Sequence, residues 1–496
     1  LEGDPVALAR DLASLTKDEA DARRCSSIRE VLVGDGLYDG SPHGSSDSPL
    51  TQEAGQSWRI APHPFLLSTS QVAFFHSLGQ HLLAFYQALN RLYLESARGA
   101  EPAWVAAYLD QGKPDSLVSY SRMKRFRDLL PGVIRPDIIP TEDAPSGNGM
   151  VITELDSVPG GIGVTGALAR AYSDFDIVGG PDGMVQGFAR MLRHHLGERT
   201  GCVAIVVSDE AQDYRPEMAW VAARLQKEGI EAYCVHPREV RFTEETLLLA
   251  RDGSDRPVSL VYRFFELFDL KNIPKSELIM YSAKKERTVV TPPFKPALEE
   301  KLAFALLHHP VLAPFWRREL GEATFDLLAG LMPRTWILDP RPVPPAAVIP
   351  DLRIGGRAVA DWRDLAEASQ RDRRYVVKPS GFSELAWGSR GVSVGHDLPQ
   401  SEWAAALDAA LASFPTTPSI LQEFHKGRQF ELSYFDERAG AVVPMSGRVR
   451  LSPYYFVIGE RAELAGVLAT LCPLDKKVIH GMRDAIMVPC AVAAQQ

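Results

Sequence analysis

The stretch ITELDSVPGGIGVTGAL, residues 152–168, joins an apolar strand to a helix through a glycine-rich turn. Glu154 and Asp156 are two positions apart, and residues two apart on a strand share one face. Like charges on one face repel each other unless a cation lies between them, and a divalent metal ion would meet that need. Small residues in the turn let backbone N–H groups approach an anion. The stretch therefore predicts a metal and anion site at a strand end.

Length and composition restrict the class of protein. The chain has 496 residues, which predicts two or three lobes. Apolar residues make up 45% and charged residues 24%, and the net charge of −9 is spread along the chain without a basic stripe. We therefore expect a globular protein with no nucleic-acid partner. The five cysteines form no CxxC pair, so we expect reduced thiols.

Membrane insertion and secretion are not expected either. No window approaches the roughly 18 uncharged apolar residues that a spanning helix needs. The start of the chain carries Asp, Lys, Glu and Arg where a secretory signal would be apolar. We expect a cytoplasmic protein that contacts no membrane.

Strand and helix patterns alternate in the middle of the chain. Residues 72–94 have apolar side chains at three- and four-residue spacing, which predicts an amphipathic helix. Residues 202–210, 214–229 and 230–240 then read as strand, helix and strand, an order typical of a parallel Rossmann-like sheet. No GxGxxG motif follows the first strand, so we do not expect this unit to hold a dinucleotide.

A lysine strand followed by a glycine loop occupies residues 375–395, YVVKPSGFSELAWGSRGVSVG. The strand carries Lys378 into a sheet, where a buried ammonium is costly unless an anion meets it. The loop contains Gly381, Ser383 and Gly388, and its small residues let N–H groups surround phosphate oxygens. This pattern indicates a nucleotide phosphate site. A lysine paired with a core carboxylate beside an ordinary hairpin is the alternative, and the segment alone does not decide.

Two later strands add further candidates. SILQEF, residues 419–424, ends in Gln422 and Glu423, and a strand end with free backbone groups beside a glutamine suits an adenine edge. VPMSGRVRLSP, residues 443–453, places Arg448 and Arg450 on one face of a strand. Arginine suits a transferring phosphoryl group. A residue of this kind taken alone is more often a solvated surface charge, and the order of the motifs is what indicates function.

This order of lysine strand, glycine loop, hinge strand and arginine resembles the ATP-grasp superfamily. Upstream segments match, in order, the synthetase region of glutathionylspermidine synthases and their circularly permuted relatives. These segments are VIRPDIIP (133–140), ITELDSVPGGIG (152–163), LVYRFFELFDL (260–270) and PPFKPALEEKLAFALL (292–307). The resemblance implies an α/β ATP-grasp fold with a Rossmann-like pre-ATP-grasp unit and a helical N-terminal region. It implies four segments: 1–115 helical, 116–200 with the carboxylates and substrate loop, 201–290 Rossmann-like, and 291–490 with the ATP-binding lobes.

The resemblance also implies roles for the early charged residues. Arg135 and Asp137 take the positions of the family's Arg-x-Asp pair, and Glu154 and Asp156 those of its Glu-x-Asn/Asp pair. Asp137, Glu154 and Asp156 would then hold Mg²⁺, as two ions, and Arg135 would guide the acceptor carboxylate. Asp156 replaces the family's usual asparagine, which adds a negative charge and still suits a hard cation.

Nucleotide contacts follow from the same resemblance. Lys301 resembles the family's first ATP lysine and Lys378 its second, while Gln422 and Glu423 fall at the adenine hinge. Gly381, Ser383 and Gly388 would contact the phosphates, from a loop that is longer than the family's. Arg450 resembles the arginine that meets the γ-phosphate, with Arg448 as the competing choice.

Substrate contacts are expected from a loop and a strand: Ser157, Gly160, Gly161 and Arg263. Residues 159–163 would offer unpaired N–H groups to the acceptor carboxylate or its acyl phosphate. Arg263 reads equally as a substrate or phosphate contact and as a sheet-edge arginine.

The implied activity is that of an ATP-dependent carboxylate–amine ligase that forms an amide through an acyl phosphate and releases ADP and phosphate. Its partners would be a small-molecule or peptide carboxylate and an amine, with ATP and Mg²⁺ as cofactors. The sequence leaves open whether the protein forms a homodimer. The alternatives are a non-catalytic nucleotide-binding protein of the same fold and a phosphotransferase for a small acid.

Overall fold

The structure is a computed structural model. It describes the following residues: 16–39, 58–100, 102–142, 149–342, 347–476, 479–481 and 484–494. Residues 1–15 and 40–57, which belong to the segment expected to be helical over 1–115, lie outside these ranges.

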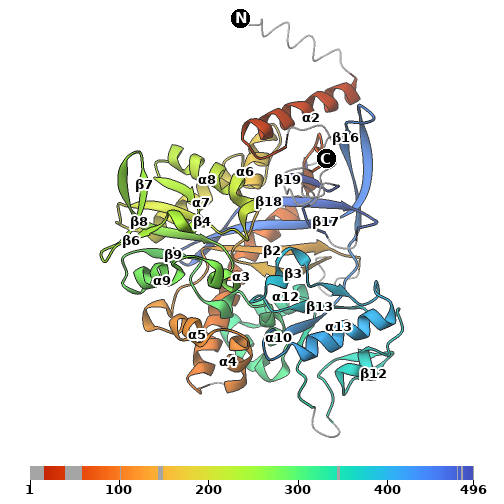
Figure 1. The fold of residues 1–496 in the computed structure, drawn as a ribbon. Coiled ribbons are helices and arrows are strands. Elements are labelled where there is room, and N and C mark those ends of the chain that lie inside the picture. The colour runs from red at the N-terminus through yellow and green to blue at the C-terminus, as the bar shows by residue number, and fades with distance from the viewer. Residues whose placement is uncertain are drawn as a thin grey trace, which may run out of the picture.

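A seven-stranded sheet forms the centre of the molecule and gathers strands from both ends of the chain (Figure 1). The strand order is β1-β19-β18-β17-β2-β3, and β16 also pairs with β17. These strands are β1 (Phe65–Leu67), β2 (Val133–Pro140), β3 (Met150–Asp156), β16 (Gln429–Asp436), β17 (Ala441–Ile458), β18 (Arg461–Pro473) and β19 (Ile486–Val492). The predicted carboxylate strands β2 and β3 therefore lie beside the predicted arginine strand β17.

A six-stranded sheet forms the Rossmann-like unit, with order β5-β4-β8-β7-β6 and β9 paired to β8. Its strands are β4 (Cys202–Val207), β5 (Ala232–Val235), β6 (Arg241–Phe242), β7 (Leu247–Arg251), β8 (Ser254–Phe264) and β9 (Val289–Thr291). β4 runs parallel to β5 and to β8, as the alternating pattern predicted. Helix α8 (Arg215–Lys227) connects β4 to β5.

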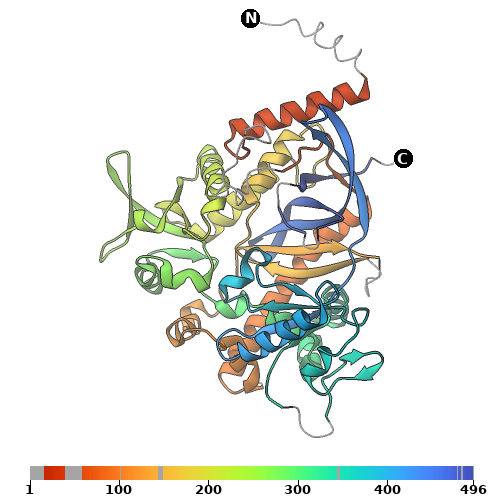
Figure 2. The same ribbon diagram turned by 45° about the vertical axis from the view of Figure 1, so that its right-hand side comes forward.

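The third layer is a smaller lobe around a four-stranded sheet of order β10-β15-β13-β14. Its strands, and those of a separate hairpin, are β10 (Thr335–Ile337), β13 (Tyr375–Pro379), β14 (Ser393–Val394), β15 (Ser419–Glu423), β11 (Arg353–Ile354) and β12 (Arg357–Ala358). Figure 2 shows the orange strands β2 and β3 between the blue C-terminal strands and this lobe. The lysine strand β13 and the carboxylate strands thus belong to neighbouring layers.

Helices cover the sheets and form the N-terminal region. They are α2 (Lys17–Gly34), α3 (Thr69–Ala97), α4 (Ala103–Asp110), α5 (Asp115–Ser121), α6 (Ile162–Ala171), α7 (Gly183–Leu196), α9 (Ser276–Lys284), α10 (Leu302–His308), α11 (Ala313–Leu320), α12 (Glu322–Leu331) and α13 (Gln400–Ala412). The predicted amphipathic helix is α3, and it begins with a capping box between Ser68 and Gln71. A Cβ at Gly79 would lie 2.5 Å from the Tyr455 ring, so this glycine lets α3 lie directly on β17.

Two other expectations concern the whole chain. All five cysteines are free thiols, as predicted, and four of them are buried. Among the helices in the described ranges, none has the length and apolar character that crossing a bilayer requires. The N-terminal region is not purely helical, because β1 joins the central sheet in parallel with β19.

Candidate active site

Strands β2 and β3 place four charged side chains on one face of the central sheet. Their antiparallel register sets Arg135 opposite Asp156 and Asp137 opposite Glu154. Directly opposed residues on paired strands share a face, so the alternation read from the sequence is confirmed.

The Arg135 guanidinium binds the two aspartates together. Its Nε lies 3.2 Å from Oδ1 of Asp137, and its Nη2 lies 3.1 Å from Oδ2 of Asp156. Burial alone would lower the pKa of Arg135, but the adjacent aspartates outweigh it and raise that pKa. Burial raises the pKa of Asp156, although Arg135 opposes this. Arg135 therefore acts as the counter-cation of this carboxylate group.

Asp137 also meets β17, and this contact distinguishes the two candidate arginines. Arg450 Nη1 lies 3.1 Å from Oδ2 of Asp137, and Ser452 Oγ donates to Oδ1 at 3.1 Å. Arg448 instead donates to the carbonyl of Leu474 at 3.2 Å. Arg450 is thus the arginine that lies among the carboxylates.

Lys301 is the partner of Glu154. Its Nζ lies 2.9 Å from Oε1 of Glu154 and donates to the carbonyl of Ala386 in the glycine loop at 3.3 Å. Burial opposes ionisation of Glu154, but Lys301 and Lys378 together outweigh it and lower its pKa to about 2. Glu154 is therefore ionised throughout the physiological range.

Lys378 projects from β13 toward the same strand. Its Nζ donates to Oε1 of Gln422 at 2.8 Å and to the carbonyl of Thr153 at 3.0 Å. Burial lowers the pKa of this ammonium to about 8, against an opposing effect of Glu154. Both partners are neutral, so the core-carboxylate alternative for Lys378 is wrong. Among the described residues Lys378 has no carboxylate in direct contact, and a buried cation of this kind suits an incoming phosphate.

The adenine-hinge expectation for β15 needs correction. Gln422 is 2% exposed and turns inward, donating to Thr335 Oγ1 at 3.2 Å as well as accepting from Lys378. The Glu423 N–H donates to the carbonyl of Arg334 at 2.8 Å. The contact with the residue that precedes β10 therefore uses the Glu423 donor that the sequence pattern predicted to be free.

The glycine loop is held by protein partners. The Gly381 N–H donates to Oε1 of Glu300 at 2.8 Å. Ser383 Oγ accepts from the N–H of Leu385 at 3.2 Å. A Cβ at Gly381 would lie 2.0 Å from the carbonyl oxygen of Glu299, so only glycine fits. Gly388 belongs to residues 387–389, whose surroundings are outside the description.

The N–H groups of the turn after β3 are also occupied, contrary to expectation. Glu217 of α8 accepts from Gly161 at 2.7 Å, Gly163 at 3.0 Å and Val164 at 3.2 Å. This buried carboxylate fills the anion site at the start of α6. Burial raises its pKa to about 7, against these hydrogen bonds. No motif in the sequence marked Glu217, because its partners lie in another layer.

Glycines in this turn are required by close packing. A Cβ at Gly160 would lie 2.1 Å from the Tyr214 ring, and one at Gly161 would lie 2.4 Å from the Tyr454 hydroxyl. Gly161 also has a φ of 89°, which favours glycine. The Gly160 carbonyl accepts from Tyr454 at 2.8 Å and from Arg135 at 3.4 Å. The turn is therefore fixed beside the carboxylates.

Arg263 is a structural residue in this arrangement. Its side chain is fully buried and binds the carboxylate of Glu299 and the carbonyls of Phe265 and Pro292. Its strand β8 lies inside its sheet, between β4 and β7. The sheet-edge reading is therefore wrong, and the buried guanidinium offers no open surface for the predicted substrate contact.

The carboxylates fit Mg²⁺ only in part. In the described ranges no three His, Cys, Asp or Glu side chains come close enough to hold a metal ion by themselves, so the predicted three-carboxylate set does not assemble. Glu154 and Asp156 face Lys301 and Arg135 instead. Mg²⁺ in nucleotide sites commonly takes one or two carboxylates together with substrate phosphates. The carboxylate oxygens of this site are hard donors, which suit Mg²⁺ bound together with substrate phosphates.

Two buried polar atoms support a ligand at this place. Ser157 Oγ and Arg450 Nε have no hydrogen-bond partner among the described residues. Buried polar groups are almost always satisfied, and an unsatisfied one is commonly explained by an absent water, ion or ligand. Ser157 is 3% exposed and directly follows Asp156. Its predicted substrate role remains a prediction.

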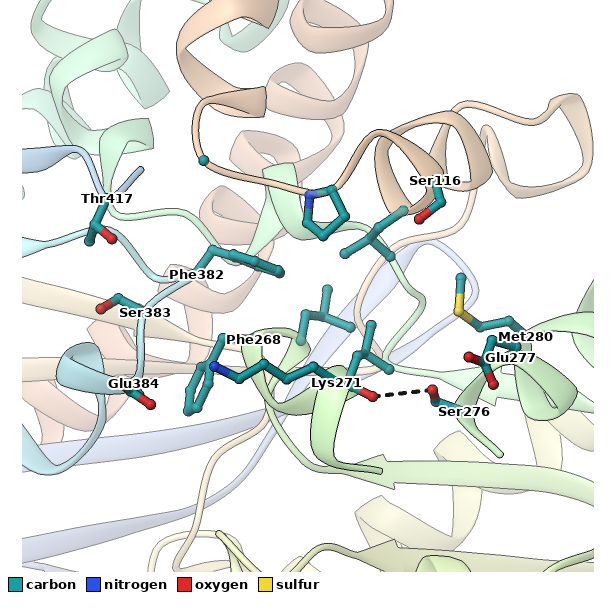
Figure 3. A pocket seen from close by; sticks show the side chains of 15 residues that line it. Ser116, Phe268, Lys271, Ser276, Glu277, Met280, Phe382, Ser383, Glu384 and Thr417 are labelled. Carbon is teal, nitrogen blue, oxygen red and sulfur yellow. Dashed lines mark hydrogen bonds between the residues drawn. The ribbon is translucent and has the colours of Figure 1, made fainter. Parts of the chain in front are cut away.

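A cavity of about 400 Å³ lies on the other side of the glycine loop. In Figure 3, Phe382 and Ser383 form one side, and Glu277 and Met280 of α9 the opposite side. Ser383 is the one predicted site residue in its lining. The cavity is therefore separate from the paired charges, although the same loop borders both.

Comparisons with known proteins establish the fold. No protein-family model matches the chain, and no curated protein matches its sequence. A solved structure of a glutathione synthetase-like effector from Globodera pallida, in its apoform, is similar over 99% of this chain and 98% of its own, at 11% identity and a TM-score of 0.57. A putative gamma-glutamylcysteine synthetase from Methylobacillus flagellatus covers 85% of this chain and 86% of its own at 11% identity, with a TM-score of 0.38. The first likeness confirms the expected α/β, ATP-grasp-type fold.

Proposed function

We propose that this protein is an ATP-dependent ligase that joins a carboxylate to an amine through an acyl phosphate. The observation that carries the proposal is the convergence of Arg135, Lys301, Lys378 and Arg450 between two sheets. These four cations lie among three carboxylates, Asp137, Glu154 and Asp156. Several buried cations that converge on one place suit the oxygens of a nucleotide polyphosphate.

Phosphoryl transfer mainly requires that the protein position the reacting groups and neutralise the charge of the phosphates. Lys378 is the cation most ready to take a phosphate oxygen, because its two contacts are neutral. Lys301 would exchange part of its contact with Glu154 for a second phosphate oxygen. Arg450, with an unsatisfied Nε, would donate to the transferring phosphoryl group and to the acyl phosphate.

Asp137 and Glu154 would hold Mg²⁺ together with the nucleotide phosphates, while Asp156 stays paired with Arg135. When bound, the ion supplies positive charge that offsets the phosphate oxygens. Two ions, as the resemblance implies, remain part of the proposal.

The acceptor carboxylate would approach Arg135 and Ser157. Because Glu217 already occupies the N–H groups of Gly161 and Gly163, the turn would shape the pocket and would not bind the carboxylate through those donors. The amine would then attack the acyl carbonyl and release phosphate. Such a reaction needs no protein nucleophile.

The substrate pair is the finer part of the proposal. The glutathione synthetase-like neighbour and the glutathionylspermidine synthase-like motifs both favour a peptide or small-molecule acid with an amine. An acidic chain of net charge −9 favours a cationic amine.

Product analysis tests this reaction. Purified protein with Mg-ATP, an acid and an amine should release ADP and phosphate, and Glu154→Gln and Lys378→Ala should each abolish the release. Lys227→Ala, at an exposed lysine of α8, is the matched control. AMP and pyrophosphate as products would rule out the acyl phosphate. Phosphorylated acid formed without any amine would indicate a phosphotransferase instead.

A non-catalytic nucleotide-binding role is the second candidate. Glu217 already occupies the turn donors expected for the acceptor carboxylate, whereas Lys378 keeps neutral partners, so the acceptor contacts are reduced while a phosphate cation stays in place. Tight ATP binding without turnover over a broad panel of acids and amines would support it.

A further inference from the structure

Lys113 is remote in sequence from most residues of the candidate site and forms a buried ion pair with Glu300. It lies between α4 and α5 in the N-terminal helical region, and its Nζ is 2.6 Å from Oε2 of Glu300. Both side chains have 0% exposure. Paired charges are costly to bury, so such a pair needs further hydrogen bonds to be tolerated.

Lys113 Nζ also donates to the carbonyl of Gln111 at 3.5 Å, whereas the further hydrogen bonds of Glu300 lead to the glycine loop and to Lys301. Oε2 of Glu300 also accepts from Ser380 Oγ at 2.7 Å. Oε1 accepts from the N–H of Gly381 at 2.8 Å and from the N–H of Lys301 at 3.1 Å. One carboxylate thus joins the start of the glycine loop to the backbone of the first phosphate lysine.

The N-terminal region touches the loop at a second point. Lys113 Nζ lies 5.8 Å from the ring centroid of Phe382, within the range of a cation–π contact. The preceding Gly112 lies against the turn before β15, where a Cβ would be 2.0 Å from the carbonyl oxygen of Thr416. The segment is therefore held on both sides and keeps Lys113 in place.

We propose that Lys113 is a positioning residue for the glycine loop. Through Glu300 it fixes Ser380 and Gly381, and with them the separation between the loop and Lys301. Without the ammonium, Glu300 would be an uncompensated buried charge and would draw in water. Water bound to the carboxylate would compete with the hydrogen bonds that hold the loop. The consequence for nucleotide binding rests on the proposed function, whereas the consequence for loop order does not.

The experiment compares Lys113→Met and Glu300→Gln with a matched control. Lys295→Met removes another buried ammonium, which donates to Asn90 and to the carbonyls of Phe126, Arg127 and Leu129, and none of these four partners lies in the glycine loop. The readouts are hydrogen exchange of the amides of residues 380–386 and the affinity for Mg-AMPPNP by calorimetry, both on the full chain.

We expect Lys113→Met to speed exchange of the loop amides at least tenfold and to weaken AMPPNP at least tenfold. Lys295→Met should lower thermal stability and leave both readouts as in the wild type. The double variant Lys113→Met/Glu300→Gln removes both charges and should recover part of the loop protection, and it also serves if either single variant fails to fold.

Unchanged loop exchange in the foldable variants, or an equal increase in Lys295→Met, would overturn the proposal. If wild-type protein does not bind AMPPNP, the proposed function fails, and loop exchange alone still decides the role of Lys113.

Discussion

Arg450 and Asp137 are 313 residues apart in sequence, and their side chains meet at 3.1 Å. Arg450 lies on β17 and Asp137 on the neighbouring β2, so backbone pairing of the two strands sets the contact. Arg448 shares the face of Arg450 but reaches the carbonyl of Leu474 instead. Two positions along β17 therefore separate an arginine that lies in the site from one that lies outside it.

This difference predicts unequal effects of two similar substitutions. Arg450→Ala should lower ATP-dependent phosphate release by about 10²–10³-fold, as expected for the loss of a donor to a transferring group. Arg448→Ala is the matched control and should stay within a few-fold of wild type. A greater loss for Arg448→Ala would place the phosphoryl group elsewhere. Initial rates of phosphate release, measured with saturating Mg-ATP, would compare the two variants with the wild type.

The pKa of Lys378 predicts a pH dependence of nucleotide binding. Burial lowers it from 10.5 to about 8, so the folded protein loses this charge between pH 8 and 10.5 while the unfolded chain keeps it. Affinity for AMPPNP should therefore fall above pH 8, and the contribution of Lys378 to stability should rise with pH in the same window. Calorimetric titrations from pH 6.5 to 9.5 and urea unfolding measure the two trends.

Lys378→Arg is the control for this titration, because a guanidinium stays protonated over the whole range. Its pH profile should be flatter than that of the wild type. Identical profiles would mean that another group causes the loss of affinity.

Gly381→Ala should disrupt the glycine loop. The added Cβ would meet the carbonyl oxygen of Glu299 at 2.0 Å, and a backbone atom cannot yield as the end of a side chain can. We expect at least a tenfold weaker affinity for AMPPNP. Gly34→Ala, at the end of α2 with no atom within 4 Å of the new Cβ, should bind as the wild type does. Normal binding by Gly381→Ala would show that the loop is freely mobile.

Glu217→Ala should destabilise the protein by about 2–3 kcal/mol, because it leaves the buried N–H groups of Gly161, Gly163 and Val164 without their acceptor. Urea unfolding at constant pH measures the change. A loss below about 0.5 kcal/mol would show that water replaces the carboxylate without cost.

Glu217→Gln separates the charge from the hydrogen bonds. Burial raises the pKa of Glu217 to about 7, so the unfolded chain ionises first as pH rises from 4.5. The stability that this residue contributes is present below pH 4.5 and is lost as pH rises through 7. The glutamine variant should lack this part of the decline, which unfolding at pH 5 and pH 7.5 would detect.

The sequence by itself determined the elements and which of their residues share a face. Two-residue spacing placed Glu154 with Asp156 and Arg448 with Arg450, and alternating strands and helices predicted the parallel pairing of β4, β5 and β8. These features follow from backbone periodicity, which is local. The order of motifs further indicated an ATP-grasp-type fold, which the structural comparison confirms.

Only the tertiary structure decided which charges meet and which donors stay open. Glu217 and Glu300 fill the N–H groups of Gly161 and Gly381 from segments remote in the chain, and no local pattern marks such partners. The same holds for the inward turn of Gln422 and the burial of Arg263. Side-chain partners depend on how three sheets pack against one another, whereas spacing along one strand fixes only the direction in which each side chain points.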